Sequence, residues 1–252
     1  MSLAVQRLHK SFGGFRVVDD VTFEAAADTI TGLIGPNGAG KSTLFAVISG
    51  YQRADSGEVS FDAEPIGALP PDARARRGIA RTFQVPRPFG HLSVRENLMA
   101  AGPNQPGERV LNLLFRPASV RRRERELQTK ADALLAFLGL EPLSTAPASS
   151  LSGGQQKLLE LGRALMTEPR YILLDEPFAG VNAVLIEQIA ERIRILAGGG
   201  TGFLIVEHNL PALAALASRL LVMDRGRLIA AGSPAEVLAD PAVQSAYIGG
   251  LA

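Results

Sequence analysis

A glycine-rich segment followed by lysine and serine is the strongest chemical pattern in the chain. Within "ITGLIGPNGAGKSTLFAVISG" (30–50), Gly35, Gly40, Lys41 and Ser42 match the pattern G-x-x-x-x-G-K-[ST]. Glycines let consecutive backbone amides turn inward and cradle a phosphate. Lys41 would place a cation against β- and γ-phosphate oxygens, and the Ser42 hydroxyl would bind Mg²⁺. The apolar run before this loop and the helical spacing after it predict a strand, a phosphate loop and a helix.

Polar residues end several other apolar runs: Gln84, Asp175 with Glu176, and His208. In parallel sheets, ligands bind beyond the carboxyl ends of the strands, where these side chains would meet Lys41. Asp175 could hold Mg²⁺, directly or through water, and Glu176 could orient and deprotonate an attacking water. His208 could donate to the γ-phosphate, and Gln84 could reach the metal or the water.

Each of these residues also has a structural interpretation. Taken alone, a histidine after a strand such as His208 is more often structural, and Gln84 is more often a solvated loop residue. Asp175 and Glu176 taken alone could open a turn before Pro177. The phosphate loop favours the catalytic interpretation for all of them.

A second anion-binding pattern occupies "LSGGQQKLLELGRAL" (151–165). Ser152 and Gln155 have capping-box spacing, which predicts that a helix begins here. Gly153 and Gly154 weaken such a helix unless something approaches the backbone closely. Free amides at a helix N-terminus bind anions, so the segment raises the question of a second phosphate contact.

The elements that would position these residues are those of a mixed α/β protein. Continuous apolar runs at 30–34, 171–174 and 203–206 alternate with helical stretches, which indicates a parallel sheet covered on both faces. "RLLVMDRGRLIAAG" predicts a strand, a turn at Arg225–Gly226 and a returning strand. The segment 57–66 is expected to add antiparallel strands.

Composition narrows the class of protein. The chain has 252 residues, 46% of them hydrophobic, with a net charge of +1 and no cysteine. The absence of cysteine excludes disulfides, thiolate metal sites and a cysteine nucleophile. No apolar run is long enough to span a membrane and the N-terminus does not resemble a secretory signal. The near-neutral charge argues neither for nor against nucleic acid.

Together these motifs resemble a known family. "GPNGAGKST", the glutamine of "RTFQ", "LSGGQ", "YILLDEP" and the histidine of "VEHN", in this order, are similar to the nucleotide-binding subunit of ATP-binding cassette (ABC) transporters. The resemblance implies a phosphate-loop (RecA-like) α/β fold. That fold has a mainly parallel sheet core, an N-terminal antiparallel β subdomain and an inserted α-helical subdomain. It implies one ABC ATPase domain over 1–252, with 1–85 and 169–252 as core and 86–168 as the helical subdomain carrying "LSGGQ".

The resemblance also implies site residues beyond those already named. Phe12 would stack on adenine and Val18 would pack under the same ring. The phosphate loop would contribute all of its members to ATP binding: Gly35, Pro36, Asn37, Gly38, Ala39, Gly40, Lys41, Ser42 and Thr43. Two subunits would pair head to tail, so that Ser152, Gly153, Gly154 and Gln155 cap the γ-phosphate held by the partner. The expected cofactors are ATP and Mg²⁺, with Ser42, Gln84 and Asp175 at the metal.

Within this family the chain looks most like the larger ATPase subunit of branched-chain amino acid importers. The likeness lies in "RTFQVPRPFGHLSVRENL", "DEPFAGVN" and the tail "GSPAEVLADPAVQSAYIG". Asn182 stands where most cassettes have aspartate, and the branched-chain group tends to carry asparagine there.

The likeness implies a set of partners and a location. Expected partners are a second ABC ATPase subunit (a paralogue or the chain itself), two integral membrane permease subunits contacted through 85–97 and, indirectly, a solute-binding protein; nucleic acid is not expected. The expected location is peripheral, on the cytoplasmic face of the inner membrane.

Two other functions compete with transport. A soluble cassette ATPase of repair, translation or cluster assembly would usually carry two cassettes or a long coiled-coil insertion, and neither is evident. A phosphate-loop kinase would leave "LSGGQ" unexplained. Arg121, Arg122, Arg123 and Arg125 could touch anionic lipid, but pairing of Arg121 with Glu124 and Arg122 with Glu126 favours a solvated helix. A partner could dock on Leu111, Leu114 and Phe115.

Overall fold

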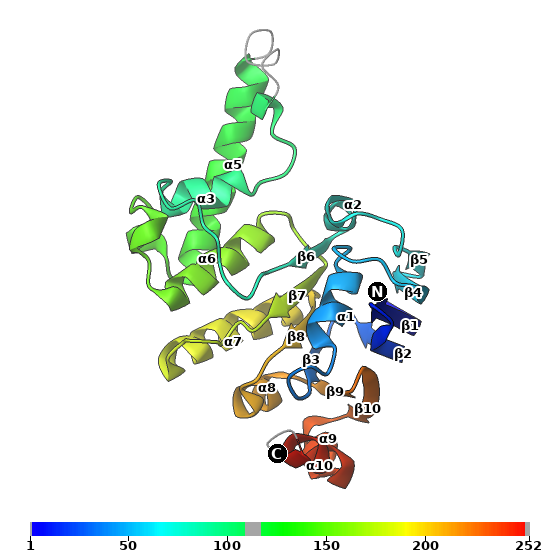
Figure 1. The fold of residues 1–252 in the computed structure, drawn as a ribbon. Coiled ribbons are helices and arrows are strands. Elements are labelled where there is room, and N and C mark those ends of the chain that lie inside the picture. Colours follow the sequence, from blue (N-terminus) through cyan, green and yellow to red (C-terminus); the bar gives the residue numbers. More distant parts are fainter. Residues whose placement is uncertain (1, 109–116, 250–252) are drawn as a thin grey trace. The chain divides into compact units, whose positions relative to one another are not determined.

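The computed structural model describes residues 2–108 and 117–249 (Figure 1). The chain forms two compact units. The core unit comprises Met1–Gln84, Pro169–Ala179 and Ile186–Ala252, and the helical unit comprises Val85–Glu168 and Gly180–Leu185. The predicted helical subdomain, 86–168, lies within the second unit, which also includes Val85 and Gly180–Leu185. The expected docking residues Leu111, Leu114 and Phe115 lie outside the described part.

A six-stranded sheet of order β10-β9-β3-β8-β7-β6 organises the core unit. Its strands are β3 (Ile30–Ile34), β6 (Ile79–Arg81), β7 (Tyr171–Asp175), β8 (Gly202–Val206), β9 (Arg219–Asp224) and β10 (Arg227–Gly232). Every pairing is parallel except that of β9 with β10. β3, β7 and β8 are buried along their whole length, as their continuous apolar sequences predicted.

A second, four-stranded antiparallel sheet has the order β2-β1-β4-β5. It contains β1 (Ser2–Phe12), β2 (Phe15–Ala26), β4 (Ser56–Phe61) and β5 (Glu64–Pro65). Both the antiparallel strands expected around 57–66 and the returning hairpin strand β10 are confirmed. The mixed α/β fold with a parallel sheet, an antiparallel sheet and a helical insertion is therefore the predicted one.

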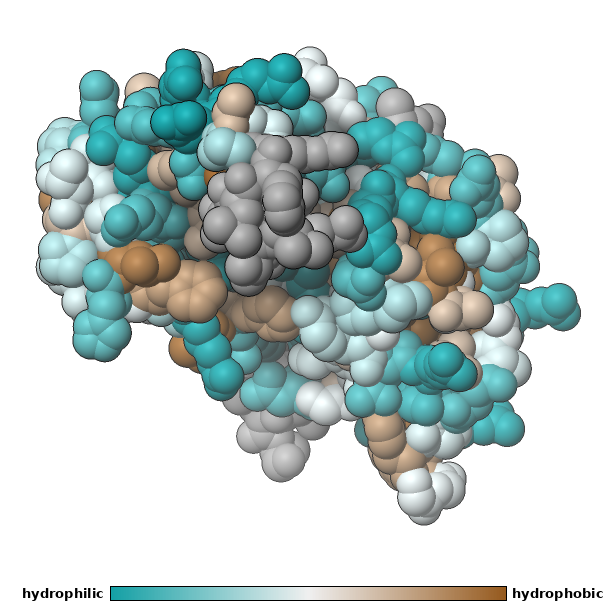
Figure 2. Space-filling model, turned by 90° about the horizontal axis from the view of Figure 1, so that it is seen from above, coloured by the Kyte–Doolittle hydropathy of each residue, from teal (hydrophilic) through white to brown (hydrophobic). Residues whose placement is uncertain are grey.

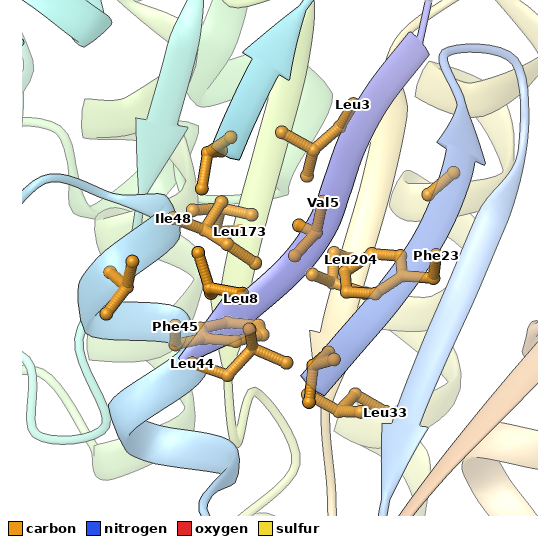
Figure 3. Packing of buried hydrophobic residues seen from close by; sticks show 14 of the residues in the cluster. Leu3, Val5, Leu8, Phe23, Leu33, Leu44, Phe45, Ile48, Leu173 and Leu204 are labelled. Carbon is orange, nitrogen blue, oxygen red and sulfur yellow. The ribbon is translucent and has the colours of Figure 1, made fainter. Parts of the chain in front are cut away.

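The main hydrophobic core joins these two sheets to helix α1 (Lys41–Ile48). Figure 3 shows Leu44, Phe45 and Ile48 of α1 gathered with side chains of β1 and with Leu173 and Leu204 of the parallel sheet. Leu44, Phe45 and Ile48 have no exposed area. At roughly 1.5–3 kcal/mol for each fully buried large side chain, this packing fixes the helix that follows the phosphate loop.

The other helices of the core unit are short, apart from α7. They are α2 (Pro71–Arg76), α8 (Leu210–Leu216), α9 (Pro234–Ala239), α10 (Pro241–Gly249) and most of α7 (Ala183–Gly198), whose first three residues belong to the helical unit. No helix within residues 2–108 and 117–249 combines the length and hydrophobicity needed to cross a membrane.

The helical unit contains α3 (Val94–Ala100), α5 (Pro117–Leu138), α6 (Gly153–Leu165) and the 3₁₀ turns η1 (Pro106–Glu108), η2 (Glu141–Leu143) and η3 (Ala148–Ser150). Within the first half of α5, Glu126 pairs with Arg122 and Arg123. The predicted Arg122 pair is thus confirmed, whereas the described residues show no pair of Arg121 with Glu124.

The predicted capping box at the start of α6 is confirmed. The Ser152 hydroxyl accepts the backbone N–H of Gln155 at 3.4 Å, and the side-chain Oε1 of Gln155 accepts the backbone N–H of Ser152 at 2.9 Å. Both bonds satisfy amides that a helix start would otherwise leave free.

Candidate active site

The phosphate loop connects the end of β3 to the start of α1. Gly40 caps α1 in the left-handed conformation, with φ of 97°. A side chain at Gly35 would overlap the carbonyl oxygen of Met223, and one at Gly40 would overlap that of Val17. Glycine is therefore required at both ends of the loop, for backbone conformation and for close approach of neighbouring backbone.

Lys41 is folded into this loop rather than exposed to solvent. Its side chain is buried, and Nζ donates to the carbonyl oxygens of Gly35 at 2.6 Å and Pro36 at 2.9 Å. Burial lowers the pKa of Lys41, and the negative charge of Glu176 partly opposes this shift. The two carbonyl contacts hold the amine at the loop that phosphates would enter.

A cavity of about 290 Å³ opens at the carboxyl ends of the parallel strands. Segments far apart in the sequence line it: Val17, Asn37, Gly38, Ala39, Gly40, Lys41, Ser42, Thr43, Gln84, Glu176, Val206 and His208. Of the strand-end residues expected to meet Lys41, the cavity holds Gln84, Glu176 and His208, whereas Asp175 is not among its lining residues. Gly35 and Pro36 stand at the base of the same loop.

Glu176 lies between two polar side chains in this cavity. Gln84 donates from Nε2 to Oε2 of Glu176 at 2.7 Å, and Nε2 of His208 lies 3.1 Å from Oε1. Glu176 itself adopts a left-handed backbone with φ of 50°, which is uncommon for a residue with a side chain. Such strain, of order 1–3 kcal/mol, tends to be retained at functional sites.

Asp175, the predicted metal ligand, is held by a residue to which the sequence gave no role. Arg81 donates from Nη2 to Oδ2 of Asp175 at 3.0 Å, and from Nη1 to the Ser49 hydroxyl at 2.8 Å. Its guanidinium carbon also lies 5.4 Å from the ring centre of Phe83 and 5.6 Å from that of Tyr51. Arginine at the end of a buried strand was the only sequence signal of this role.

The two residues expected at the adenine ring are placed differently. Phe12 is 47% exposed, and Nζ of Lys10 lies 5.2 Å from the centre of its ring. Val18 has no exposed area and packs in the core, whereas its neighbour Val17 lines the cavity. Successive side chains of a strand point to opposite faces, so only one of the two valines can face a ligand.

Ser152, Gly153, Gly154 and Gln155, the "LSGGQ" residues expected to cap the partner's nucleotide, belong to the helical unit. A Cβ on Gly154 would overlap the Leu185 side chain of the same unit, so close packing already explains this glycine. A Cβ on Gly153 would meet nothing within 4 Å. Packing therefore gives no reason for the absence of a side chain at Gly153, which remains open and exposed.

Comparison with known proteins identifies the family. Residues 18–179 match the family model of the ABC transporter, and residues 227–252 match that of the branched-chain amino acid ATP-binding cassette transporter. The chain is 41% identical over 249 residues to the probable branched-chain amino acid transport ATP-binding protein LivG of Archaeoglobus fulgidus, covering 98% of this chain and 95% of that one. It is 38% identical over 248 residues to the lipopolysaccharide export system ATP-binding protein LptB of Escherichia coli K12, covering 98% and 97%.

Solved structures agree with the sequence comparison. A nucleotide-free ATP-binding cassette from an ABC transporter superposes with a TM-score of 0.87 at 41% identity, covering 99% of this chain and all of that one. A cassette in its ADP conformation gives a TM-score of 0.86, also at 41% identity, with 99% of both chains covered. The chain therefore belongs to the ATP-binding cassette transporter family and is one of its ATPases.

Proposed function

We propose that this ATPase powers the import of branched-chain or related amino acids. The observation that carries the proposal is the C-terminal match of residues 227–252 to the branched-chain amino acid cassette model, in addition to the general cassette match. The LivG relatives at 41% and 42% identity support it. The 38% identity to LptB makes lipopolysaccharide the competing cargo, with export as the competing function.

In this proposal the cavity takes the phosphates of ATP. The loop amides and Lys41 would contact the phosphate oxygens, as in other phosphate loops. Phe12, being exposed, would stack on adenine, and Val17 would take the contact expected of Val18, which is buried. The cavity, with Val17 in its wall, and the Phe12 ring would then hold the nucleotide from base to γ-phosphate.

The oxygen donors of the site suit Mg²⁺. In the part of the chain that the structure describes, no three His, Asp or Glu side chains gather as a metal site. A mixed set remains: Ser42 and Gln84 line the cavity with a hydroxyl and an amide oxygen. Asp175 does not line it, and one of its oxygens accepts from Arg81, so its carboxylate would reach the ion through the other oxygen or through water. Mg²⁺ binds through a few such oxygens together with waters and nucleotide phosphates. When bound, the ion would neutralise charge on the β- and γ-phosphates.

The base that activates water would be Glu176. Its carboxylate faces the cavity between Gln84 and His208. Gln84 could orient the water or the metal, and His208 could donate to the γ-phosphate. This division of roles places a carboxylate as general base and two neutral or cationic donors beside it.

Pairing with a second cassette subunit would complete the site. Gly153, which has open space around it, is the natural point of approach for a γ-phosphate held by the partner. The amides at the start of α6 and the Ser152 hydroxyl would then cap that phosphate. The partner would be a paralogue or a second copy of this chain, arranged head to tail.

Two permease subunits would bind the ATPase at the cytoplasmic face of the inner membrane and undergo the conformational changes that ATP binding and hydrolysis drive. Exposed apolar side chains support a protein contact in the expected segment 85–97: Val85, Phe89 and Leu92 are 66%, 53% and 37% exposed. Figure 2 shows small hydrophobic areas on a mostly hydrophilic or mixed surface. A solute-binding protein would act indirectly through the permease, and nucleic acid would take no part.

A gene-deletion strain tests the cargo. Complementation with the wild-type chain should restore uptake of radiolabelled leucine, isoleucine and valine, and complementation with Lys41→Ala should not. Unchanged uptake of these amino acids in the deletion strain would refute amino-acid import. A concurrent loss of surface lipopolysaccharide would favour lipopolysaccharide export as the function. Purification of a tagged chain without any integral membrane protein would instead support a soluble cassette ATPase.

A further inference from the structure

A buried glutamate lies between two segments that line the cavity. Glu207 follows the last residue of β8 and precedes His208, and it is only 3% exposed. Among the residues that the structure describes, none forms an ion pair with it. Burying a carboxylate without a neighbouring cation is costly unless hydrogen bonds compensate.

Three backbone amides supply that compensation. Oε1 of Glu207 accepts the N–H of Phe178 at 2.6 Å. Oε2 accepts the N–H of His208 at 2.9 Å and that of Asn209 at 3.1 Å. The two oxygens therefore hold two different loops, one after β7 and one after β8.

These two loops carry the catalytic side chains. Phe178 is two residues beyond Glu176, and Nε2 of His208 lies 3.1 Å from Oε1 of Glu176. The N–H of Glu176 also donates to the carbonyl oxygen of Val206 at 2.9 Å, directly before Glu207. One carboxylate thus joins the backbone segments whose separation sets the distance between Glu176 and His208.

We infer that Glu207 is a positioning residue that fixes His208 against Glu176 for ATP hydrolysis. The inference rests on the roles proposed above for Glu176 and His208. Glu207 faces backbone amides and lines no part of the cavity, so it acts through the two loops.

Glutamine is the informative replacement because it has the same shape but only one acceptor. If its carbonyl oxygen keeps Phe178, its NH₂ group faces the N–H groups of His208 and Asn209. If it keeps those two, the NH₂ group faces Phe178. In either case the glutamine NH₂ group and a backbone N–H, both donors, face each other, so one loop must move away from the other. Aspartate instead keeps two acceptor oxygens on a shorter side chain.

The first experiment compares Glu207→Gln, Glu207→Asp and the control Glu236→Gln in the assembled transporter. Glu236 is a capping carboxylate that accepts the Ser233 N–H at 2.9 Å and lies outside the cavity. Glu207→Gln should lower kcat by about tenfold to a hundredfold, the scale of small misplacements in active sites. Its ATP Kd should stay within about twofold of wild type. Glu207→Asp should retain more activity, and Glu236→Gln should retain all of it.

The second experiment repeats Glu207→Gln in a His208→Ala background. With no imidazole left to position, the further loss in kcat should shrink to about twofold or less. An equal loss in both backgrounds, or a parallel weakening of ATP binding, would overturn the inference and leave only a structural role. Near wild-type turnover of His208→Ala alone would show instead that the role proposed for His208 is wrong, and the inference would fall with it. If Glu207→Gln does not fold, Glu207→Asp is compared in the wild-type and His208→Ala backgrounds instead, and an equal loss of kcat in both would overturn the inference.

Discussion

Arg81 and Asp175 form a nearly buried ion pair. Nη2 of Arg81 lies 3.0 Å from Oδ2 of Asp175, and the two side chains are 13% and 11% exposed. Arg81 also bonds the Ser49 hydroxyl at the end of α1. The pair therefore links the helix that follows the phosphate loop to the strand that carries the predicted metal ligand, and it fixes the direction of one Asp175 oxygen.

Loss of this pair should destabilise the core unit. Arg81→Ala should lower the free energy of unfolding by about 3–5 kcal/mol, because Asp175 would remain buried without its cation. Urea-induced unfolding measures the change. The matched control is Arg76→Ala, which breaks an ion pair with Asp72 at exposures of 72% and 64% and should cost less than about 1 kcal/mol. Equal costs for the two variants would contradict this account of Arg81.

The contacts of Lys41 predict a binding defect. Lys41→Ala should weaken MgATP binding roughly tenfold to a hundredfold, the value of a charge-assisted contact of about 1.5–3 kcal/mol. Calorimetric titration gives the affinity directly. Unchanged affinity would show that the amine held by Gly35 and Pro36 does not reach the phosphates.

The two neighbouring valines of β2 should give opposite phenotypes. Val18→Ala should lower stability by roughly 1–3 kcal/mol because it leaves a cavity in the core. Val17→Ala should change stability by less and weaken nucleotide binding, because Val17 lines the site. Thermal unfolding and ATP titration of both variants test this assignment. If Val18→Ala weakens ATP binding selectively at unchanged stability, the expectation based on family resemblance was right.

The roles of Gly153 and Gly154 can be distinguished in the same way. Gly153→Asp has open space, so it should leave the fold and monomer ATP affinity intact and prevent MgATP-dependent pairing. Like charges about 4 Å apart repel by about 4 kcal/mol at an effective dielectric of 20. Gly154→Asp would also displace Leu185 and so cannot isolate the electrostatic effect.

Size-exclusion chromatography in a Glu176→Gln background would show the pairing of the Gly153→Asp chain. The second cassette subunit must be added if the natural pair is a heterodimer. A Gly153→Asp chain that still pairs with MgATP would contradict the head-to-tail arrangement.

Strand ends were predictable because they depend on local apolar runs. The strand expected at 30–34 is β3, the run at 203–206 ends with β8, and the run at 171–174 ends one residue before β7 does. The parallel pairing of these strands then brings their end residues to one cavity, as the sequence predicted. Local pattern and sheet topology thus sufficed for most of the site.

Contacts between distant segments were not predictable. Arg81 and Asp175 are 94 residues apart, and Glu207 meets Phe178 across 29 residues. Nothing local to Gly154 indicates that Leu185 fills the space beside it. The choice between Val17 and Val18 depends on which face of β2 meets the cavity, and two adjacent valines carry no alternating pattern that would decide it.

The central claim is that the Glu176 carboxylate, between Gln84 and His208, activates the water that attacks ATP bound at the phosphate loop. The rate of ATP hydrolysis by the Glu176→Gln variant tests this claim most directly. Single-turnover hydrolysis of bound, radiolabelled ATP should fall by on the order of a hundredfold or more, the scale of a general base, while the ATP Kd stays unchanged. A Glu176→Gln transporter that hydrolyses bound ATP at nearly the wild-type rate would show that Glu176 is not the base.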